Sequence, residues 1–127
     1  MPDLPPVPAG VIIWTEASRF DTLAEFYAGT LGLEPITRRP DHIAFADAGF
    51  RLTIGVHSEV RGRAIDPLRV MVNLAVQDIF STSRKLHDLG VELIRTPELE
   101  SWGGWIATLS DPDGNTVQLL QLPQEPG

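Results

Sequence analysis

Cysteine is absent from the 127 residues, and this excludes disulfides, thiolate metal sites and cysteine nucleophiles together. The absence fits a reducing compartment, so we expect a cytoplasmic protein. Long apolar runs are also missing, since no stretch approaches the roughly 20 residues that cross a bilayer. Residues 1–10 hold four prolines and no basic region ahead of an apolar run, which predicts an extended tail rather than a signal peptide.

Positive charge is scarce. The chain has 10 Lys and Arg against 17 Asp and Glu, for a formal net charge of −7. Phosphate contacts need clustered cations, so this balance disfavours nucleic acid as a partner. A cationic or neutral small molecule suits the surface potential better, although an acidic surface also serves solubility alone.

The order strand, helix, three strands occurs twice along the chain. The apolar and β-branched residues 11–16 predict a buried strand, and the apolar spacing over 18–31 predicts a helix ended by Gly32. Asp78 is placed to cap a second helix, which Gly90 ends. Further strands are expected at 33–39, 42–48, 50–57, 68–76, 91–96, 104–110 and 115–122.

A short internal repeat supports this organisation. "LGLEPIT" at 31–37 matches "LGVELIR" at 89–95, at the same structural point of each half. We therefore predict an α+β fold of two βαβββ modules in one structural domain, with mixed curved sheets enclosing a cleft. The predicted parts are a tail at 1–10, modules at 11–57 and 68–122, a linker at 58–67 and a tail at 123–127.

Three sequence features carry a resemblance to a known family. The paired modules, "FYAGTLGL" at 26–33, and "WGG" before "DPDGNTVQLLQ" at 111–121 resemble the vicinal oxygen chelate superfamily. That superfamily includes glyoxalase I, extradiol dioxygenases, and the fosfomycin- and bleomycin-resistance proteins. The resemblance implies that metal-dependent members place His, Gln or Glu at inward positions of the first and last strands of each module. Those positions are here Ile12, Thr53, Met71 and Gln118.

These four side chains are poor metal ligands. Isoleucine cannot ligate, a thioether is soft, and neither Thr53 nor Gln118 supplies charge. We therefore predict no cofactor. The alternative is a divalent-metal lyase, isomerase or dioxygenase like glyoxalase I, which would require Gln118 to be joined by Glu16 or by a histidine of a partner chain.

Two other patterns have structural explanations. "DPDGN" at 111–115 resembles the start of a calcium loop, but Gly114 stands too early and no glutamate follows at the required distance, so a tight turn is expected. His42, His57 and His87 lack a second ligand at metal spacing in their own segments, and we expect them to be solvated or hydrogen-bonded.

Tryptophan is the main functional signal. Trp14 has the strand parity of Ile12, and two other tryptophans flank a pair of glycines; an indole offers apolar area and attracts cations, although core packing also explains such residues. Asn73 has the parity of Met71 and would add an amide to the site, and Arg51 has the parity of Thr53 and could meet an anionic group. The predicted ligand-binding residues are Trp14, Arg51, Thr53, Met71, Asn73, Trp102, Trp105 and Gln118.

The leading hypothesis is a metal-independent small-molecule-binding protein similar to the bleomycin-resistance branch. It would sequester an apolar or cationic aromatic ligand in a tryptophan-lined cleft rather than act as an enzyme. Acid–base catalysis by Glu16 is a further possibility, if an adjacent indole desolvates the carboxyl and raises its pKa; the other possibility is that Glu16 lies in water at the strand end. We expect a homodimer, because that is the commonest closed assembly.

Overall fold

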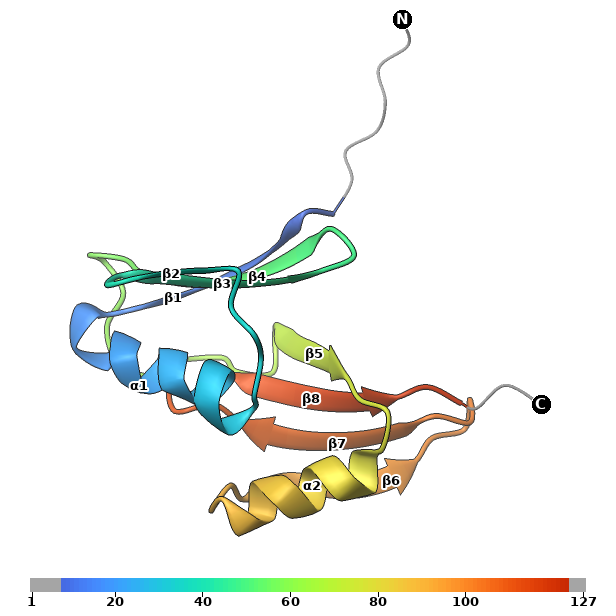
Figure 1. Cartoon of the computed structure of the whole chain (residues 1–127). Helices are drawn as coiled ribbons and strands as arrows, with labels where there is room; N and C mark the ends of the chain where they lie inside the picture. The colour runs from blue at the N-terminus through green and yellow to red at the C-terminus, as the bar shows by residue number, and fades with distance from the viewer. Residues whose placement is uncertain (1–7, 124–127) are drawn as a thin grey trace, which may run out of the picture. The chain divides into compact units, whose positions relative to one another are not determined.

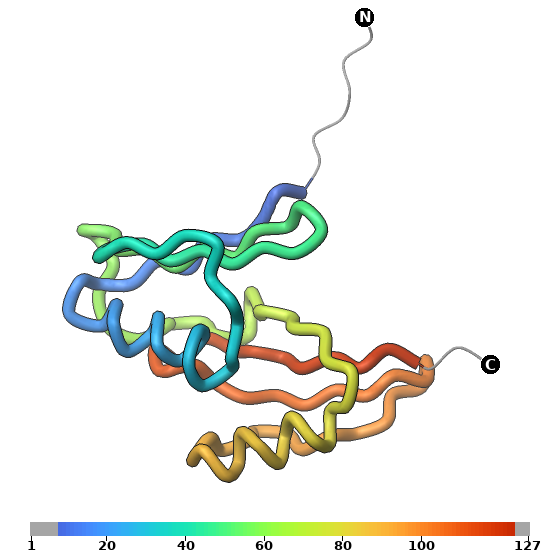
Figure 2. The backbone as a smooth tube through the Cα atoms, viewed as in Figure 1, coloured from blue at the N-terminus to red at the C-terminus, as the bar shows by residue number. Residues whose placement is uncertain are grey.

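Residues 8–123 are described by the computed structural model, in which the chain divides into two compact units, Met1–Gly62 and Arg63–Gly127. Each described unit has the order strand, helix, three strands (Figure 1). Figure 2 shows the backbone of the same two units as a tube in the same view. The α+β class with two four-stranded mixed sheets is confirmed, and the unit boundary falls within the predicted 58–67 linker.

Most of the two predicted tails lies outside the described residues. Residues 1–7 and 124–127 belong to those tails, while Gly10 already begins the first strand. No helix within 8–123 is long and apolar enough to cross a membrane.

The first unit forms a sheet in the order β1-β4-β3-β2, in which β1 and β4 run parallel and the other neighbours are antiparallel. Its last hairpin turns through Ala48 and Gly49, whose φ values of 50° and 85° give the left-handed pair that tight hairpins need. The elements are β1 (Gly10–Thr15), α1 (Phe20–Glu25), β2 (Thr37–Arg39), β3 (His42–Asp47) and β4 (Phe50–Val56).

The helix expected over 18–31 has three different helical geometries. A 3-10 turn, Ala17–Arg19, precedes α1, and a π turn, Phe26–Thr30, follows it. The N–H of Leu31 donates to the Phe26 carbonyl at 2.8 Å, which is the wider hydrogen bond of a π turn. Gly32 then takes φ 77°, so the predicted end of the helix is confirmed.

The second unit repeats the sheet as β5-β8-β7-β6, again with the first and last strands parallel. The Asp78 carboxylate caps its helix by accepting from the N–H groups of Phe80 and Ser81, both at 3.1 Å. The elements are β5 (Met71–Ala75), α2 (Ile79–Asp88), β6 (Leu93–Leu99), β7 (Trp105–Ser110) and β8 (Thr116–Gln121).

The segment 111–115 is a turn, as predicted. One oxygen of the Asp111 carboxylate accepts from the N–H groups of Asp113 and Asn115, both at 2.9 Å, and the other accepts from the Asn115 amide at 2.8 Å. Gly114 takes φ 83°. These oxygens close the β7–β8 connection, which is the role of an Asx turn.

Each sheet has one face covered by its own helix and one helix-free face. In the first unit the buried apolar set on the helix side includes Ile13, Ile43 and Ile54, while Ile12 is 52% exposed. In the second unit Val117 and Leu119 are buried on the helix side. The period-two alternation therefore decides which side chains each helix-free face presents.

Candidate functional site

The first helix-free face is the side of the β1-β4-β3-β2 sheet opposite α1. Cross-strand register defines it, because directly paired residues point to the same side. Its three rows are Trp14–Gly55–His42–Arg39, Ile12–Thr53–Ala44–Thr37 and Gly10–Arg51–Ala46.

Trp14 is held in place on this face while remaining 46% exposed. A Cβ on its cross-strand partner Gly55 would come within 2.9 Å of the indole, so only glycine lets the ring lie this close. The ring also meets His57 edge-on, with centroids 5.3 Å apart. Nδ1 of His57 accepts from the N–H of Glu59 at 3.0 Å, which places the neutral ring's proton on Nε2.

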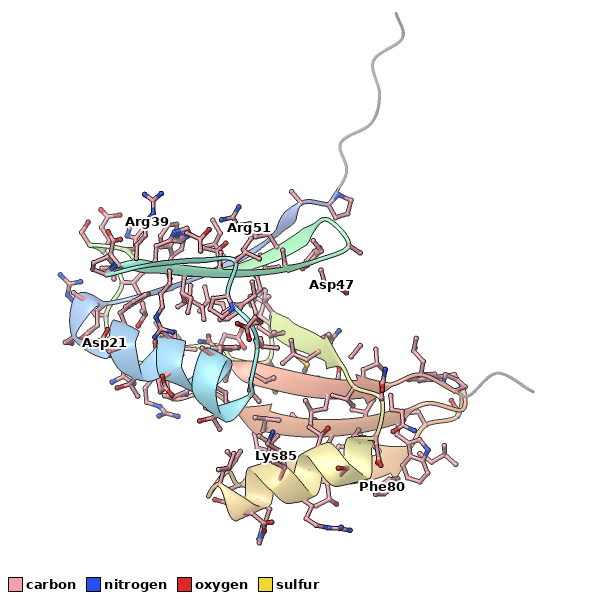
Figure 3. All side chains as sticks on the ribbon, viewed as in Figure 1. Asp21, Arg39, Asp47, Arg51, Phe80 and Lys85 are labelled. Atoms are coloured by element: carbon pink, nitrogen blue, oxygen red, sulfur yellow. The ribbon has the colours of Figure 1, made fainter. Side chains whose placement is uncertain are left out.

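Two predicted residues, Thr53 and Arg51, lie on this same face, as their shared parity required. Figure 3 shows Arg51 and Arg39 together on the side of the sheet away from α1. Arg39 and His42 were not among the predicted site residues, because the sequence does not reveal how β2 and β3 align with β1. Hairpin register, set by the turn at 47–50, is the signal that could have found them.

The second helix-free face is the side of the β5-β8-β7-β6 sheet opposite α2. Register places three predicted residues here, with Asn73 directly beside Gln118 and Met71 one row away. A row of polar side chains crosses all four strands of this face: Asn73, Gln118, Thr108 and Arg95.

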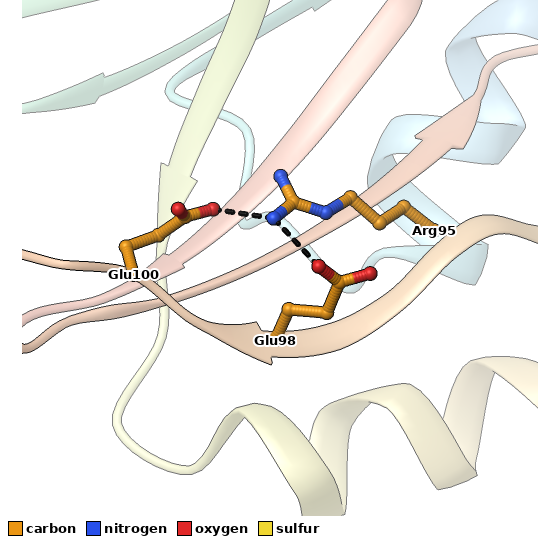
Figure 4. A network of polar contacts seen from close by, with 3 residues as sticks. All are labelled: Arg95, Glu98 and Glu100. Carbon is orange, nitrogen blue, oxygen red and sulfur yellow. Dashed lines mark hydrogen bonds and ion pairs between the residues drawn. The ribbon is translucent and has the colours of Figure 1, made fainter.

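Arg95 ends that row in a network with two carboxylates (Figure 4). One guanidinium nitrogen donates to Glu98 at 2.9 Å and to Glu100 at 2.6 Å. The hydrogen bond that Arg95 donates to Glu98, followed by the one it donates to Glu100, raises the pKa of Arg95, and the bond to Glu98 lowers the pKa of Glu98. Sequence reasoning missed this network, because a register shift in β6 decides where Arg95 points.

The structure separates Trp105 from the other predicted residues. It pairs with Gln121, an odd number of residues from Gln118, and therefore points to the α2 side of the sheet. Its ring packs edge-on against Phe80 of α2, with centroids 4.9 Å apart. Trp105 therefore does not share a face with Gln118, and core packing, the alternative interpretation, describes its position.

Trp102 lies in the turn between β6 and β7 and is 49% exposed. Its ring folds back so closely onto Gly104 that a Cβ there would overlap it. The Trp105–Gln121 pair stands three pairs, or ~10 Å, from the Thr108–Gln118 pair. Trp102 lies beyond that end of the strands, so the structure does not bring it beside Gln118.

Glu16 follows β1 and is only partly exposed. Its carboxylate accepts from the Ser18 hydroxyl at 2.6 Å and from the Gly62 N–H at 2.7 Å. These two bonds, the first foremost, lower the pKa of Glu16. The raised pKa that acid–base catalysis would require is therefore not found, because hydrogen bonding to the charged form outweighs desolvation here.

The residues at the family's metal positions do not fit a divalent cation. Ile12 pairs with Thr53 on the first face, and Met71 and Gln118 lie on the second. Mg²⁺, Mn²⁺ and Fe²⁺ bind carboxylates, imidazoles and other oxygen donors, whereas this set offers no charge and no imidazole. Within residues 8–123, no three His, Cys, Asp or Glu side chains are grouped closely enough to hold a metal ion.

Residues 17–119 match the Glyoxalase/Bleomycin resistance protein/Dioxygenase superfamily. The bleomycin resistance protein of Klebsiella pneumoniae is 29% identical over 111 residues, which cover 80% of this chain and 83% of that protein. An uncharacterized protein, YetH of Bacillus subtilis, is 23% identical over 108 residues, 85% of this chain and 82% of that protein.

Solved structures agree with this match at the level of the fold. Lactoylglutathione lyase from Agrobacterium tumefaciens aligns with a TM-score of 0.71 at 17% identity, over 94% of this chain and 96% of that one. A glyoxalase-related enzyme from Fulvimarina pelagi aligns with a TM-score of 0.70 at 22% identity, over 97% and 92%. With most of its length matched, this chain belongs to the Glyoxalase/Bleomycin resistance protein/Dioxygenase superfamily.

Proposed function

We propose that this protein binds a small aromatic molecule without a resident divalent metal and holds it without converting it. The observation that carries the proposal is the set of side chains at the family's metal positions: Ile12, Thr53, Met71 and Gln118. An apolar surface with a few orienting polar groups is the usual composition of a ligand site. Further support comes from a relative at 29% identity, the bleomycin resistance protein of Klebsiella pneumoniae, whose name connects the family with a small molecule.

Each of the two helix-free faces, taken by itself, has features that suit a ligand. Trp14 offers a half-exposed indole that Gly55 and His57 hold in one orientation. Asn73 and Gln118 place two neutral amides side by side, which can donate and accept hydrogen bonds without requiring a charged ligand. The sequence prediction of an apolar or cationic ligand depended on the tryptophans and on the net charge.

The metal-dependent alternative is less well supported by the residues. It needs a carboxylate or imidazole beside Gln118, and Glu16, the carboxylate that the sequence suggested, already accepts two hydrogen bonds. Two of the three histidines have other neighbours, since His87 is exposed next to Asp88 and Nδ1 of His57 accepts from the N–H of Glu59.

Metal retention is the first test. Purified protein is soaked with Mg²⁺, Mn²⁺, Fe²⁺, Ni²⁺ and Zn²⁺, desalted, and measured by mass spectrometry. We expect every ion well below one equivalent, because the donor set carries no charge. Near-stoichiometric retention that Gln118→Ala abolishes, and that Gln77→Ala at an exposed position leaves intact, would contradict the proposal.

Ligand binding is the second test, by tryptophan fluorescence with a panel of neutral, anionic and cationic aromatic compounds. We expect at least one class to quench emission with saturation, and Trp14→Phe to weaken that binding more than Trp102→Phe. If no compound in the panel changes the emission or binds by calorimetry, the proposal fails.

We also propose a homodimer. Support comes from exposed apolar side chains of the segment that leads into β5, where Ile65, Leu68 and Val70 are 100%, 68% and 65% exposed. These three side chains lie within six residues of the chain, and large exposed apolar patches mark interfaces in soluble proteins. The cytoplasmic location stays a prediction from the sequence.

A further inference from the structure

The charges on the first helix-free face are of one sign. Arg39 and Arg51 point to this side of the sheet, and none of its positions in β1, β2, β3 or β4 carries Asp or Glu. The first unit is nevertheless acidic as a whole, as is the chain, with its net charge of −7. The face therefore carries a local charge opposite to that of the molecule.

These two arginines are not used by the fold. Both are exposed, and no residue within 8–123 forms an ion pair or a side-chain hydrogen bond with either of them. By contrast, Arg95 contacts two carboxylates and Arg69 pairs with Asp66 at 3.1 Å. Both guanidinium groups extend from the sheet away from α1, where a ligand can reach them (Figure 3).

The surface of the sheet between these arginines and the Trp14 indole, called the floor below, carries mostly small side chains. Gly55, Ala44, Ala46 and Thr53 occupy the central strands of the face. Trp14 pairs with Gly55, and Arg51 lies four residues before Gly55 on β4. The distance along the strand between those two positions is ~13 Å. An arginine side chain covers about half of that span, so a molecule of two fused rings can contact the Trp14 indole at one end and a guanidinium at the other.

We propose that the first helix-free face binds an aromatic carboxylate. The rings stack on or against Trp14, and the carboxylate pairs with Arg51, with Arg39 as the second cation at the far side of the floor. A planar guanidinium matches a carboxylate with two parallel hydrogen bonds. This inference rests on the proposed function and adds the charge and class of its ligand, which the net charge of the chain had predicted with the opposite sign.

Three naphthalene probes that share one ring system test the charge. They are 2-naphthoate, the neutral 2-naphthamide and the cationic 2-naphthylmethylamine, titrated by calorimetry into the full-length protein at pH 7. We expect the naphthoate to bind about fivefold to tenfold more tightly than the amide, and the amine most weakly. Raising NaCl from 50 to 500 mM should narrow the difference in affinity between naphthoate and naphthamide, because salt screens an exposed pair of arginine and carboxylate.

Arginine variants then test the location. Arg51→Gln and Arg39→Gln should each weaken naphthoate binding and leave naphthamide binding unchanged, while Arg51→Lys should retain part of the preference. Arg38→Gln is the matched control, because Arg38 neighbours Arg39 on β2 but pairs with Ile43 and points to the other side. Circular dichroism melts confirm that each variant is folded.

The failures are distinguishable. If the probes bind with equal affinity, or the amine binds best, and Trp14→Phe weakens them all, the charge inference is overturned while ligand binding stands. If Arg38→Gln has the same effect as Arg39→Gln, the preference is not local and the inference is wrong. If no probe binds, or Arg51→Gln changes the oligomeric state by light scattering without affecting naphthoate, the assignment of this face is overturned.

Discussion

At the scale of single residues, the environment of each polar group decides what the group can do. Glu16 accepts hydrogen bonds from Ser18 and Gly62, and these connect the end of β1 to the segment that follows β4. Ser83 presents the opposite case, since its hydroxyl is buried on α2 and has no hydrogen-bond partner among the described residues. The first group should contribute to stability, and the second should cost stability.

Glu16→Gln should lower the stability at pH 7, because the amide is a weaker acceptor than the carboxylate. The pKa of Glu16 is lowered from 4.5 in the folded chain, so the charged form favours folding. Its contribution is therefore present above pH 4.5 and is lost as the pH falls through the lowered folded value. Urea unfolding from pH 7 to pH 3 should show the deficit of the variant shrinking, whereas the exposed Glu34→Gln should show little deficit at any pH.

Ser83→Ala should raise the free energy of unfolding by about 1 kcal/mol, because it removes an unsatisfied buried hydroxyl and adds helix propensity. Ser81→Ala, at an exposed position on the same helix, controls for propensity alone. Chemical denaturation of both variants checks this, and a loss of stability in Ser83→Ala would mean that the hydroxyl has a partner.

At the scale of elements, caps and turns predicted from residue types are confirmed where they are local. Asp78 caps α2, and Ala48 and Gly49 turn the β3–β4 hairpin, because both features depend on residues within a few positions of one another. The strand predicted at 33–39 is shorter than expected and pairs only over Thr37–Arg39. Pro35 contributes, since proline has no N–H to offer a neighbouring strand.

Asp78→Ala should lower the stability of the second unit by about 1 kcal/mol, since two N–H groups at the start of α2 lose their acceptor. Asp78→Asn keeps an oxygen acceptor and should cost less. Thermal unfolding followed by circular dichroism measures both, and equal losses in the two variants would show that charge, not capping, matters at this position.

At the scale of the whole molecule, net charge is a poor guide to the ligand. The formal charge of −7 favours a cationic ligand. The charged side chains on the first helix-free face, however, are the arginines Arg39 and Arg51. Electrostatic steering depends on where charges lie as well as on their sum. An anionic ligand that binds beside Arg51 and Arg39 is therefore compatible with a protein of negative net charge.

Light scattering at micromolar concentration should report a mass of about twice 13.9 kDa if the chain is a homodimer. The exposed apolar residues Leu68 and Val70 give the reason, since association removes them from water. Leu68→Glu should shift the population towards monomer. A wild-type protein that is monomeric throughout the concentration range would contradict the expectation.

The sequence by itself determined the α+β class, the repeated module, the cap at Asp78, the turn at 111–115 and the family. Each of these rests on residues close together in the chain or on a repeat that is visible in the letters. Strand parity, with its period of two, also grouped Trp14 with Ile12 and Arg51 with Thr53, and the family resemblance gave both groups inward positions.

Only the tertiary structure decided which side chains meet across strands. Cross-strand register aligns residues 14, 55, 42 and 39 from four strands, and it sends Trp105 to the α2 side. A one-residue shift in register exchanges the two faces of a strand, and the shifts in β6 set where Arg95 points. Strand parity does not decide that choice, because it is made by pairing between strands such as β1 and β4, which lie far apart in the chain.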